Sequence, residues 1–177
     1  MGMGIVLPDR LEREDRRQAL RAVARIERLV LGRLGTWRIG GVTAAEPPRN
    51  LRSDVWTAHP AGATQWSTVT PIAFDRHPKD ADRSSYQREV ARMIAQACVR
   101  VELPEPCEVI VTAVSAHLGV PPAHVFPRIE RKDGSRRRHA HAILVFDQPV
   151  RGPILLGAGR YRGYGVCRPL HDTSSPA

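Results

Sequence analysis

A histidine flanked by two cations is the group of residues in this chain best suited to chemistry. His77 lies close to Arg76 and Lys79 within the loop-like stretch DRHPKDADRS. Cleavage of RNA without a metal needs a base for the ribose 2′-hydroxyl, an acid for the 5′-oxygen and cations beside the phosphate. Histidine serves in either proton-transfer role near neutral pH. The pattern predicts that His77 is a catalytic base or acid and that its two neighbours bind phosphate, although an ordinary exposed loop histidine has the same pattern.

Two further histidines, His139 and His141, are competing candidates and possible partners of His77. They lie in the strand-like stretch RRRHAHAILVF. Side chains that alternate with them are expected to face a helix: Ala140, Ala142, Leu144 and Phe146. On an open sheet face, the two histidines would contact RNA or form an acid–base pair; at a seam with another domain, they would be hydrogen-bonded. Their spacing permits metal chelation, but no nearby carboxylate or cysteine completes a ligand set, so neither a metal nor another cofactor is predicted.

The stretch GAGRYRGYG at 157–165 combines glycine with arginine and tyrosine. Its glycines allow positive φ angles and close approach of a ligand to the backbone amides: Gly157, Gly159, Gly163 and Gly165. Arg160 and Arg162 add positive charge, and Tyr161 and Tyr164 offer rings on which bases stack. The loop is therefore predicted to hold an RNA backbone, the alternative being a turn whose glycines serve tight packing. No GxGxxG follows a strand, which excludes a dinucleotide fingerprint.

Positive charge is concentrated in the C-terminal part of the chain. The formal net charge is +9, and residues 128–171 contain ten Arg or Lys against three acids. Of the 27 basic residues, 25 are arginine, whose planar fork suits phosphate. A GC-rich genome also enriches arginine, but the clustering favours a polyanionic partner. Three consecutive arginines are predicted to bind phosphates: Arg136, Arg137 and Arg138.

The order of predicted elements indicates an α+β protein with a ferredoxin-like (RRM-like) βαββαβ domain. A helix is expected from Asp9, its cap, to Leu31 before Gly32, and a connector containing the short strand TWRIGGV follows. The expected elements after it are a strand at 66–74 made irregular by Pro71, a helix at 84–101, strands at 107–116 and 136–146, a short helix within 152–159, and a strand at 164–170. The predicted divisions are 1–65 for the helix and connector, 66–172 for the ferredoxin-like domain and 173–177 for a tail.

Composition narrows the class of protein. No apolar run is long enough for a membrane span, and no secretory signal begins the chain, so a soluble cytoplasmic protein is expected. Cys98, Cys107 and Cys167 form no CxxC pair and are expected to be small core residues. Walker, GxSxG and HExxH motifs are absent from the sequence. A nucleic-acid phosphodiester is the substrate that the basic and histidine-bearing features jointly favour.

Two stretches carry a resemblance to a known family. WSTVTPIAFDRHPK at 66–79 and GPILLGAGRYRGYG at 152–165 resemble the C-terminal half of the fused repeat-RNA-processing subunit of type I-U (also called I-G) CRISPR systems, in the RAMP superfamily. The similarity extends back through TWRIGGV and LRSDVW to about residue 20. In that family a first ferredoxin-like domain precedes this region, so the chain is expected to be a fragment or a split form.

This resemblance implies a metal-independent endoribonuclease that cleaves precursor CRISPR repeat RNA to a 5′-hydroxyl and a 2′,3′-cyclic phosphate. It also implies three partners: the repeat RNA, other subunits of a type I interference complex, and possibly the missing N-terminal ferredoxin-like domain. Relatives in the superfamily often carry their catalytic histidine in or near the helix after a first strand, usually in the N-terminal domain. The alternatives are a non-catalytic scaffold for guide RNA and an RNA-recognition module unrelated to CRISPR.

Overall fold

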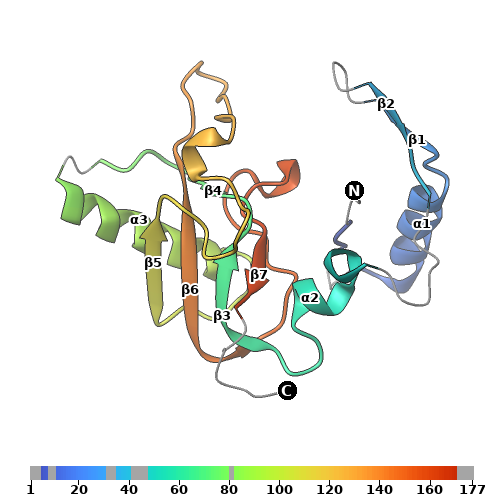
Figure 1. Ribbon diagram of the computed structural model, residues 1–177, viewed down its shortest axis with the longest axis horizontal. Helices are drawn as coiled ribbons and strands as arrows, with labels where there is room; N and C mark the ends of the chain where they lie inside the picture. Colours follow the sequence, from blue (N-terminus) through green and yellow to red (C-terminus); the bar gives the residue numbers. More distant parts are fainter. Residues whose placement is uncertain (1–4, 8–10, 31–34, 41–47, 80–81, 171–177) are drawn as a thin grey trace. The chain divides into compact units, whose positions relative to one another are not determined.

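The computed structural model describes residues 5–7, 11–30, 35–40, 48–79 and 82–170 (Figure 1). The chain divides into two compact units, Met1–Arg52 and Ser53–Ala177. The second unit starts with a short helix, α2 (Ser53–Thr57), which is joined to the later chain by a hydrogen bond from the Gly152 amide to the Thr57 carbonyl at 2.9 Å.

The first unit contains one helix and one small hairpin. Helix α1 (Arg13–Ala24) is followed by strands β1 (Arg28–Val30) and β2 (Thr36–Arg38), which pair antiparallel, and by the 3-10 turn η2 (Arg49–Leu51). The expected strand in TWRIGGV is therefore confirmed at β2.

The expected helix from Asp9 to Leu31 was too long. Helix α1 ends at Ala24, whereas the helical spacing of the apolar residues Leu20, Val23, Ile26 and Val30 had predicted that Ile26 and Val30 belong to it as well. The spacing fits a helix, but β-branched residues such as Ile26 and Val30 favour strands, and here Arg28–Val30 pairs with Thr36–Arg38 as a hairpin instead. The expected cap at Asp9 and stop at Gly32 lie outside the described residues.

The second unit contains a five-stranded antiparallel sheet. Its strands are β3 (Ala63–Thr68), β4 (Ile72–Ala73), β5 (Glu108–Thr112), β6 (His139–Val150) and β7 (Cys167–Pro169). β6 pairs with β3, β4 and β5, and β3 also pairs with β7, so the order is β5–β6–β3–β7. This is the strand order of a ferredoxin-like fold, which confirms the predicted class.

Pro71 interrupts the first strand of the sheet, as its sequence indicated. Without an amide hydrogen, proline cannot donate to a strand ladder. The break separates β3 from β4, yet both run along the same edge of β6. Val69 donates to the carbonyl of Val166 at 2.7 Å, and the Pro71 carbonyl accepts from Gly165 at 2.9 Å. The glycine-rich segment thus lies beside the break.

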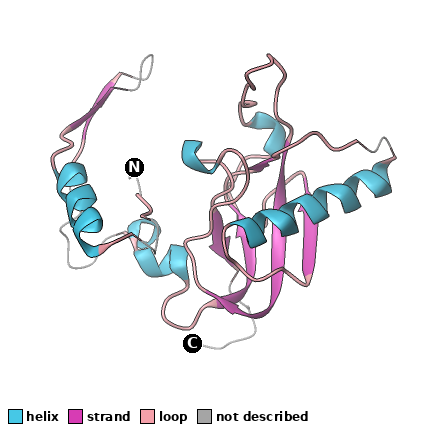
Figure 2. Cartoon of the chain, turned by 180° about the vertical axis from the view of Figure 1, so that it is seen from behind, coloured by secondary structure: helices cyan, strands magenta, loops and turns pink. Residues whose placement is uncertain are grey.

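Helix α3 (Arg83–Arg100) covers one face of the sheet (Figure 2). Asp82 caps it by accepting hydrogen bonds from the amides of Ser84 at 3.0 Å and Ser85 at 3.1 Å. Helical spacing predicts that the apolar residues of this segment lie on one stripe, and the structure buries that stripe against the sheet: Val90, Ile94, Ala97 and Cys98. From β6, the core receives Ala142, Leu144 and Phe146, as alternation predicted.

The second helix of the βαββαβ pattern is reduced to a single turn. The short helix expected within 152–159 was wrong, because that segment contains bends and a turn around Leu155, which forms a bridge with Val166. Pro153 and the glycines beyond it disfavour a helix. The only helical structure described there is the 3-10 turn η4 (Arg160–Arg162).

Candidate functional site

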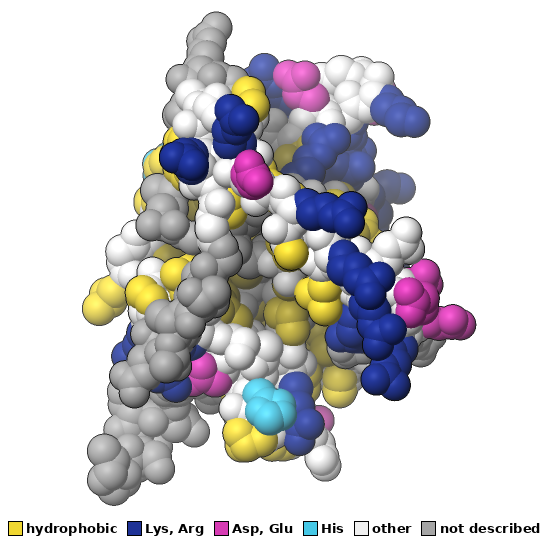
Figure 3. Space-filling view, turned by 90° about the vertical axis from the view of Figure 1, so that its right-hand side faces the viewer, with side chains coloured by type: hydrophobic (Ala, Val, Ile, Leu, Met, Phe, Trp, Pro, Cys, Tyr) yellow, Lys and Arg dark blue, Asp and Glu magenta, His cyan; other side chains and the backbone are white. Residues whose placement is uncertain are grey.

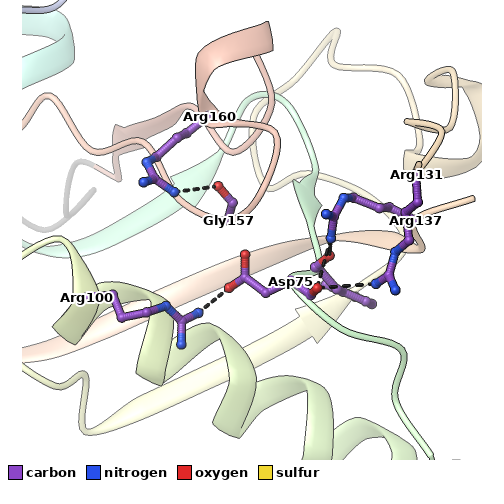
Figure 4. Close-up of polar contacts among 7 residues, drawn as sticks. Asp75, Arg100, Arg131, Arg137, Gly157 and Arg160 are labelled. Atoms are coloured by element: carbon purple, nitrogen blue, oxygen red, sulfur yellow. Dashed lines mark hydrogen bonds and ion pairs between the residues drawn. The ribbon is translucent and has the colours of Figure 1, made fainter. Parts of the chain in front are cut away.

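Three guanidinium groups, one from α3 and two from the segment at 131–137, contact the two residues that follow β4 (Figure 4). Arg137 Nη1 donates to the carbonyl oxygens of Phe74 at 2.9 Å and Asp75 at 2.8 Å, and Arg131 Nη2 donates to the Asp75 carbonyl at 3.2 Å. Arg100, at the end of α3, forms an ion pair with the Asp75 carboxylate. We call Asp75, Arg100, Arg131 and Arg137 the Asp75 cluster.

A hairpin at 129–137 places two of these arginines side by side. Its backbone bonds join Arg131 to Ser135 and Arg137 to Ile129, both at 2.8 Å, and Gly134 turns with φ +77°. Residues paired across an antiparallel hairpin share a face with those two positions away. Arg131 and Arg137 therefore project from the same face. The sequence analysis named Arg137 but missed the other members of the cluster, Asp75, Arg100 and Arg131. Of these, Arg131 could have been found from the register of the hairpin.

The Asp75 cluster carries an excess of positive charge. Within the described part of the chain, Asp75 is the one carboxylate that forms an ion pair with a cluster arginine, and neither Arg131 nor Arg137 has such a pair. The Arg131 Nε–H group is buried and has no acceptor among the residues that the structure describes. On the surface drawn in Figure 3, Lys and Arg side chains are more extensive than Asp and Glu side chains, in keeping with the net charge of +9 for the whole chain. An anion is the ligand that such a cluster favours.

The loop with His77 is tied to α3 by Glu89. Arg76 forms an ion pair with Glu89 Oε1, and the Lys79 amide donates to Glu89 Oε2 at 2.7 Å. Glu89 is buried, whereas His77 between its two contacts is exposed. Arg76 thus has an internal carboxylate partner, and Lys79 keeps its exposed side chain. His77, Arg76 and Lys79 were grouped because they are neighbours in the sequence. The structure shows in addition that the Asp75 cluster is built around the residue two positions before His77.

His141 is shut off from solvent, with 0% of its surface exposed. Its Nε2 lies 3.1 Å from the Pro121 carbonyl, which can only accept, so Nε2 carries the proton. Thr68 Oγ1 then donates to Nδ1 at 2.9 Å. Burial lowers the pKa of His141, and its neutral form is favoured.

His139 is engaged in a similar way. Its Nε2 donates to the Ala123 carbonyl at 2.7 Å, its Nδ1 is buried without a partner among the described residues, and Tyr164 packs edge-on against the ring at 6.0 Å. Of the two alternatives for His139 and His141, the structure shows hydrogen-bonded histidines and not an open sheet face, although their partners belong to this fold and not to another domain. The 3-10 turn η3 (Ala123–Val125) and the chain before it cover this end of the face, which the strand pattern could not show.

His117, to which the sequence assigned no role, joins strands β3 and β7 through its ring. Arg168 donates to its Nδ1 at 3.0 Å, so the proton is on Nε2, which lies 3.3 Å from the carbonyls of Ser67 and Arg168. Since His117 is also buried, we assign it to packing rather than to chemistry.

The three consecutive arginines do not share one surface. Arg136 lies 3.6 Å from Glu130 and both are exposed. The Arg138 guanidinium lies 5.8 Å from the ring centre of Tyr86 on α3. Only Arg137 enters the Asp75 cluster. Alternation along an extended segment sends Arg137 to the opposite face from Arg136 and Arg138, and those two have different neighbours, Glu130 and Tyr86.

Most of the glycines serve packing. A Cβ at Gly157 would lie 2.4 Å from the Ala73 carbonyl oxygen, one at Gly165 would lie 2.0 Å from that of Leu156, and one at Gly159 would lie 2.6 Å from Tyr164 Cβ. Gly163, with φ +78°, has open space instead.

The expected phosphate cradle is largely occupied by the protein itself. Amides of this loop already donate within the chain: Ala158, Arg160, Arg162, Tyr164 and Gly165. The buried glycines, Gly157, Gly159 and Gly165, therefore serve tight packing, which was the alternative to a loop that holds RNA. The exposed part of this loop runs from Tyr161 to Gly163.

The two tyrosines of this loop differ in environment. Tyr161 is 86% exposed, and the Arg160 guanidinium stacks on its ring with the centre 4.6 Å away. Arg160 also donates to the Gly157 carbonyl at 3.3 Å. Tyr164 donates its hydroxyl to the Pro127 carbonyl and packs against Phe126. Only the Tyr161 ring is accessible for stacking.

A family model matches residues 50–169 to the CRISPR-associated protein, GSU0054 family. The chain belongs to this family. Membership places its role in CRISPR-based defence and indicates CRISPR components as partners. The matched range runs from η2 to β7 and includes the Asp75 cluster, His77 and the glycine-rich loop. Comparisons with curated proteins and with solved structures find no match.

Two kinds of feature are absent from the described part of the chain: a group of metal ligands and a membrane-spanning helix. Among the described residues, no three His, Cys, Asp or Glu side chains come together as metal ligands. No described helix combines the length and apolar character needed to cross a membrane.

Proposed function

We propose that this CRISPR-associated protein binds precursor CRISPR repeat RNA and cleaves it without a metal ion, as the processing part of a type I-G interference complex. The observation that carries the proposal is the Asp75 cluster, an arginine-rich site directly before the exposed His77. Phosphate binding there would place the RNA backbone against the loop at 75–79. Family membership supplies the CRISPR context, and the excess of arginine supports a polyanionic substrate.

In the proposed reaction, neutral His77 accepts the proton of the ribose 2′-hydroxyl. The 2′-oxygen attacks the adjacent phosphorus, and the bond from phosphorus to the 5′-oxygen breaks. The imidazolium of His77 returns the proton to the 5′-oxygen, so the products are a 2′,3′-cyclic phosphate and a 5′-hydroxyl. Guanidinium groups stabilise the negative charge that develops on the phosphoryl oxygens.

Labelled repeat RNA incubated with the protein in EDTA tests this function. We expect cleavage of the all-ribose RNA and no cleavage of RNA with a 2′-deoxy sugar at the scissile position. His77→Ala should abolish cleavage and leave binding within about threefold, with His124→Ala, an exposed histidine outside the site, as the matched control. Equal cleavage by the His77 variant, or cleavage of the deoxy RNA, refutes the proposed chemistry.

A non-catalytic scaffold that holds guide RNA is the second candidate. One observation favours it: both predicted partners of His77, His139 and His141, are held by carbonyl groups within the fold. Repeat RNA that binds tightly and remains intact in the same assay would identify the scaffold. The third alternative, a module unrelated to CRISPR, is excluded by the family.

A further inference from the structure

We propose that Arg100, Arg131 and Arg137 bind a single phosphate group and that the Asp75 carboxylate is the internal competitor of that phosphate. The assignment of this phosphate to the RNA backbone rests on the proposed function. The binding site itself is argued from the geometry of the Asp75 cluster.

The cluster arginines have donors beyond those that hold them in place. Each guanidinium carries five N–H groups. Arg137 uses Nη1 for the Phe74 and Asp75 carbonyls, and Arg131 uses Nη2 for the Asp75 carbonyl. These bonds fix the two groups beside each other and leave each with donors on its other nitrogens. Arg131 Nε is a buried donor for which the described chain provides no acceptor.

Charge favours a ligand with more than one negative oxygen. The Arg100 guanidinium pairs with the Asp75 carboxylate, whereas Arg131 and Arg137 donate to the backbone carbonyl of the same residue, so the three guanidinium groups and one carboxylate of the Asp75 cluster carry an excess of two positive charges. Phosphate presents several oxygens to donors that approach from different directions, which fits groups supplied by α3 and by both arms of the 129–137 hairpin. The pairing of Asp75 with Arg100 shows that an anion is accepted at this place.

Asp75 also repels any second anion that approaches Arg100. Its carboxylate is part-exposed, with 40% of the side chain accessible, so it can turn away from Arg100 when a phosphate binds. Replacement by the isosteric amide removes the repulsion and frees Arg100. The Asp75 carboxylate is thus predicted to weaken phosphate binding. Removal of this carboxylate should therefore increase affinity more than removal of another surface carboxylate, which would not be expected of a generally basic surface.

Inorganic pyrophosphate is the probe, and isothermal titration calorimetry of the full chain at 100 mM salt measures its affinity. Asp75→Asn should tighten pyrophosphate binding about 3–10-fold. Glu108→Gln, which removes one negative charge from the exposed edge strand β5, is the matched control and should change affinity by less than about twofold. Equal effects of the two variants, or no binding of pyrophosphate by the unaltered chain, overturn the proposal.

A second pair of variants tests the cations without disturbing the hairpin. Arg100→Gln should weaken pyrophosphate binding at least about threefold, whereas Arg92→Gln, on the same helix and exposed, should have little effect. Thermal melts confirm folding of each variant. Equal losses overturn the site. If the protein cleaves repeat RNA but the variants do not change pyrophosphate affinity as predicted, the proposed function stands and the phosphate site is refuted. If the variants change pyrophosphate affinity as predicted but the protein does not bind repeat RNA, the phosphate site stands and the proposed function is refuted.

Discussion

Glu89 Oε2 accepts a hydrogen bond from the Lys79 amide at 2.7 Å, and this contact fixes the loop after β4 to the middle of α3. The other carboxylate oxygen pairs with Arg76, so the two contacts lie on either side of His77. A buried carboxylate that bonds both to a cation and to the backbone orders the loop between them. The position of the exposed histidine therefore depends on a helix residue far from it in sequence.

Glu89→Gln should lower RNA cleavage more than RNA binding. The amide loses the ion pair with Arg76, and a misplaced His77 reduces the rate by about 10–100-fold. Binding should stay within about threefold. Single-turnover cleavage and filter binding measure the two effects, with Glu105→Gln, an exposed acid outside the loop, as control. If cleavage by the Glu89 variant equals that of the control, His77 does not depend on this anchor.

Tyr161→Leu should weaken repeat-RNA binding. Stacking of a base on an aromatic ring contributes about 1–3 kcal/mol, so a loss of about 5–100-fold is expected. Tyr161→Phe keeps the ring and should bind like the unaltered protein. Fluorescence anisotropy with labelled RNA measures the affinities. Unchanged binding by the leucine variant would show that the exposed ring takes no base.

Stability should fall as the pH drops below about 6.5. Burial lowers the pKa of His141 from its ordinary 6.5, with a smaller contribution from His139, so the unfolded chain binds the proton more readily. The stability contributed by neutral His141 is fully present above pH 6.5 and is lost progressively as the pH falls from that value through the lower pKa of the folded protein. Urea unfolding at pH 7.5 and 5.0 measures the difference, and His141→Gln should reduce it. An equal pH dependence in the variant would contradict this origin.

Gly165→Ala should destabilise the fold more than Gly163→Ala. Both glycines have positive φ angles, for which a Cβ costs about 1–2 kcal/mol. At Gly165 the new atom would also lie 2.0 Å from the Leu156 carbonyl oxygen, whereas the space at Gly163 is open. Urea denaturation of both variants gives the comparison. Equal losses of stability would mean that the backbone at Gly165 yields without cost.

Thiol reagents should label Cys107 first. Burial raises the pKa of Cys98 to about 12 and also raises that of Cys167, so neither thiol ionises near neutral pH. Cys107 is exposed, which corrects the expectation that all three cysteines belong to the core. Its pKa is raised as well, so its labelling should be slow. Mass spectrometry of the native protein should show one modified cysteine and, in urea, three.

Local patterns predicted the elements that depend on neighbours in sequence. The stripe from Val90 to Cys98 follows the helical period, and the alternation from Ala140 to Phe146 follows the strand period, so both buried faces were correct. Pro71 marked an irregular strand because a missing amide acts locally. The sequence indicated that the backbone at Gly157 and Gly165 is closely approached by another group. It could not show that this group is a carbonyl oxygen of the protein and not a ligand.

Charge, order of elements and periodicity were thus determined by the sequence alone, because each depends on residue type and on spacing within one segment. The cover over His141 and the meeting of Arg100, Arg131 and Arg137 at Asp75 were decided only by tertiary structure. These contacts join segments that are distant in the chain. A distant contact depends on strand register, on loop path and on which face a helix covers, and no single segment encodes these.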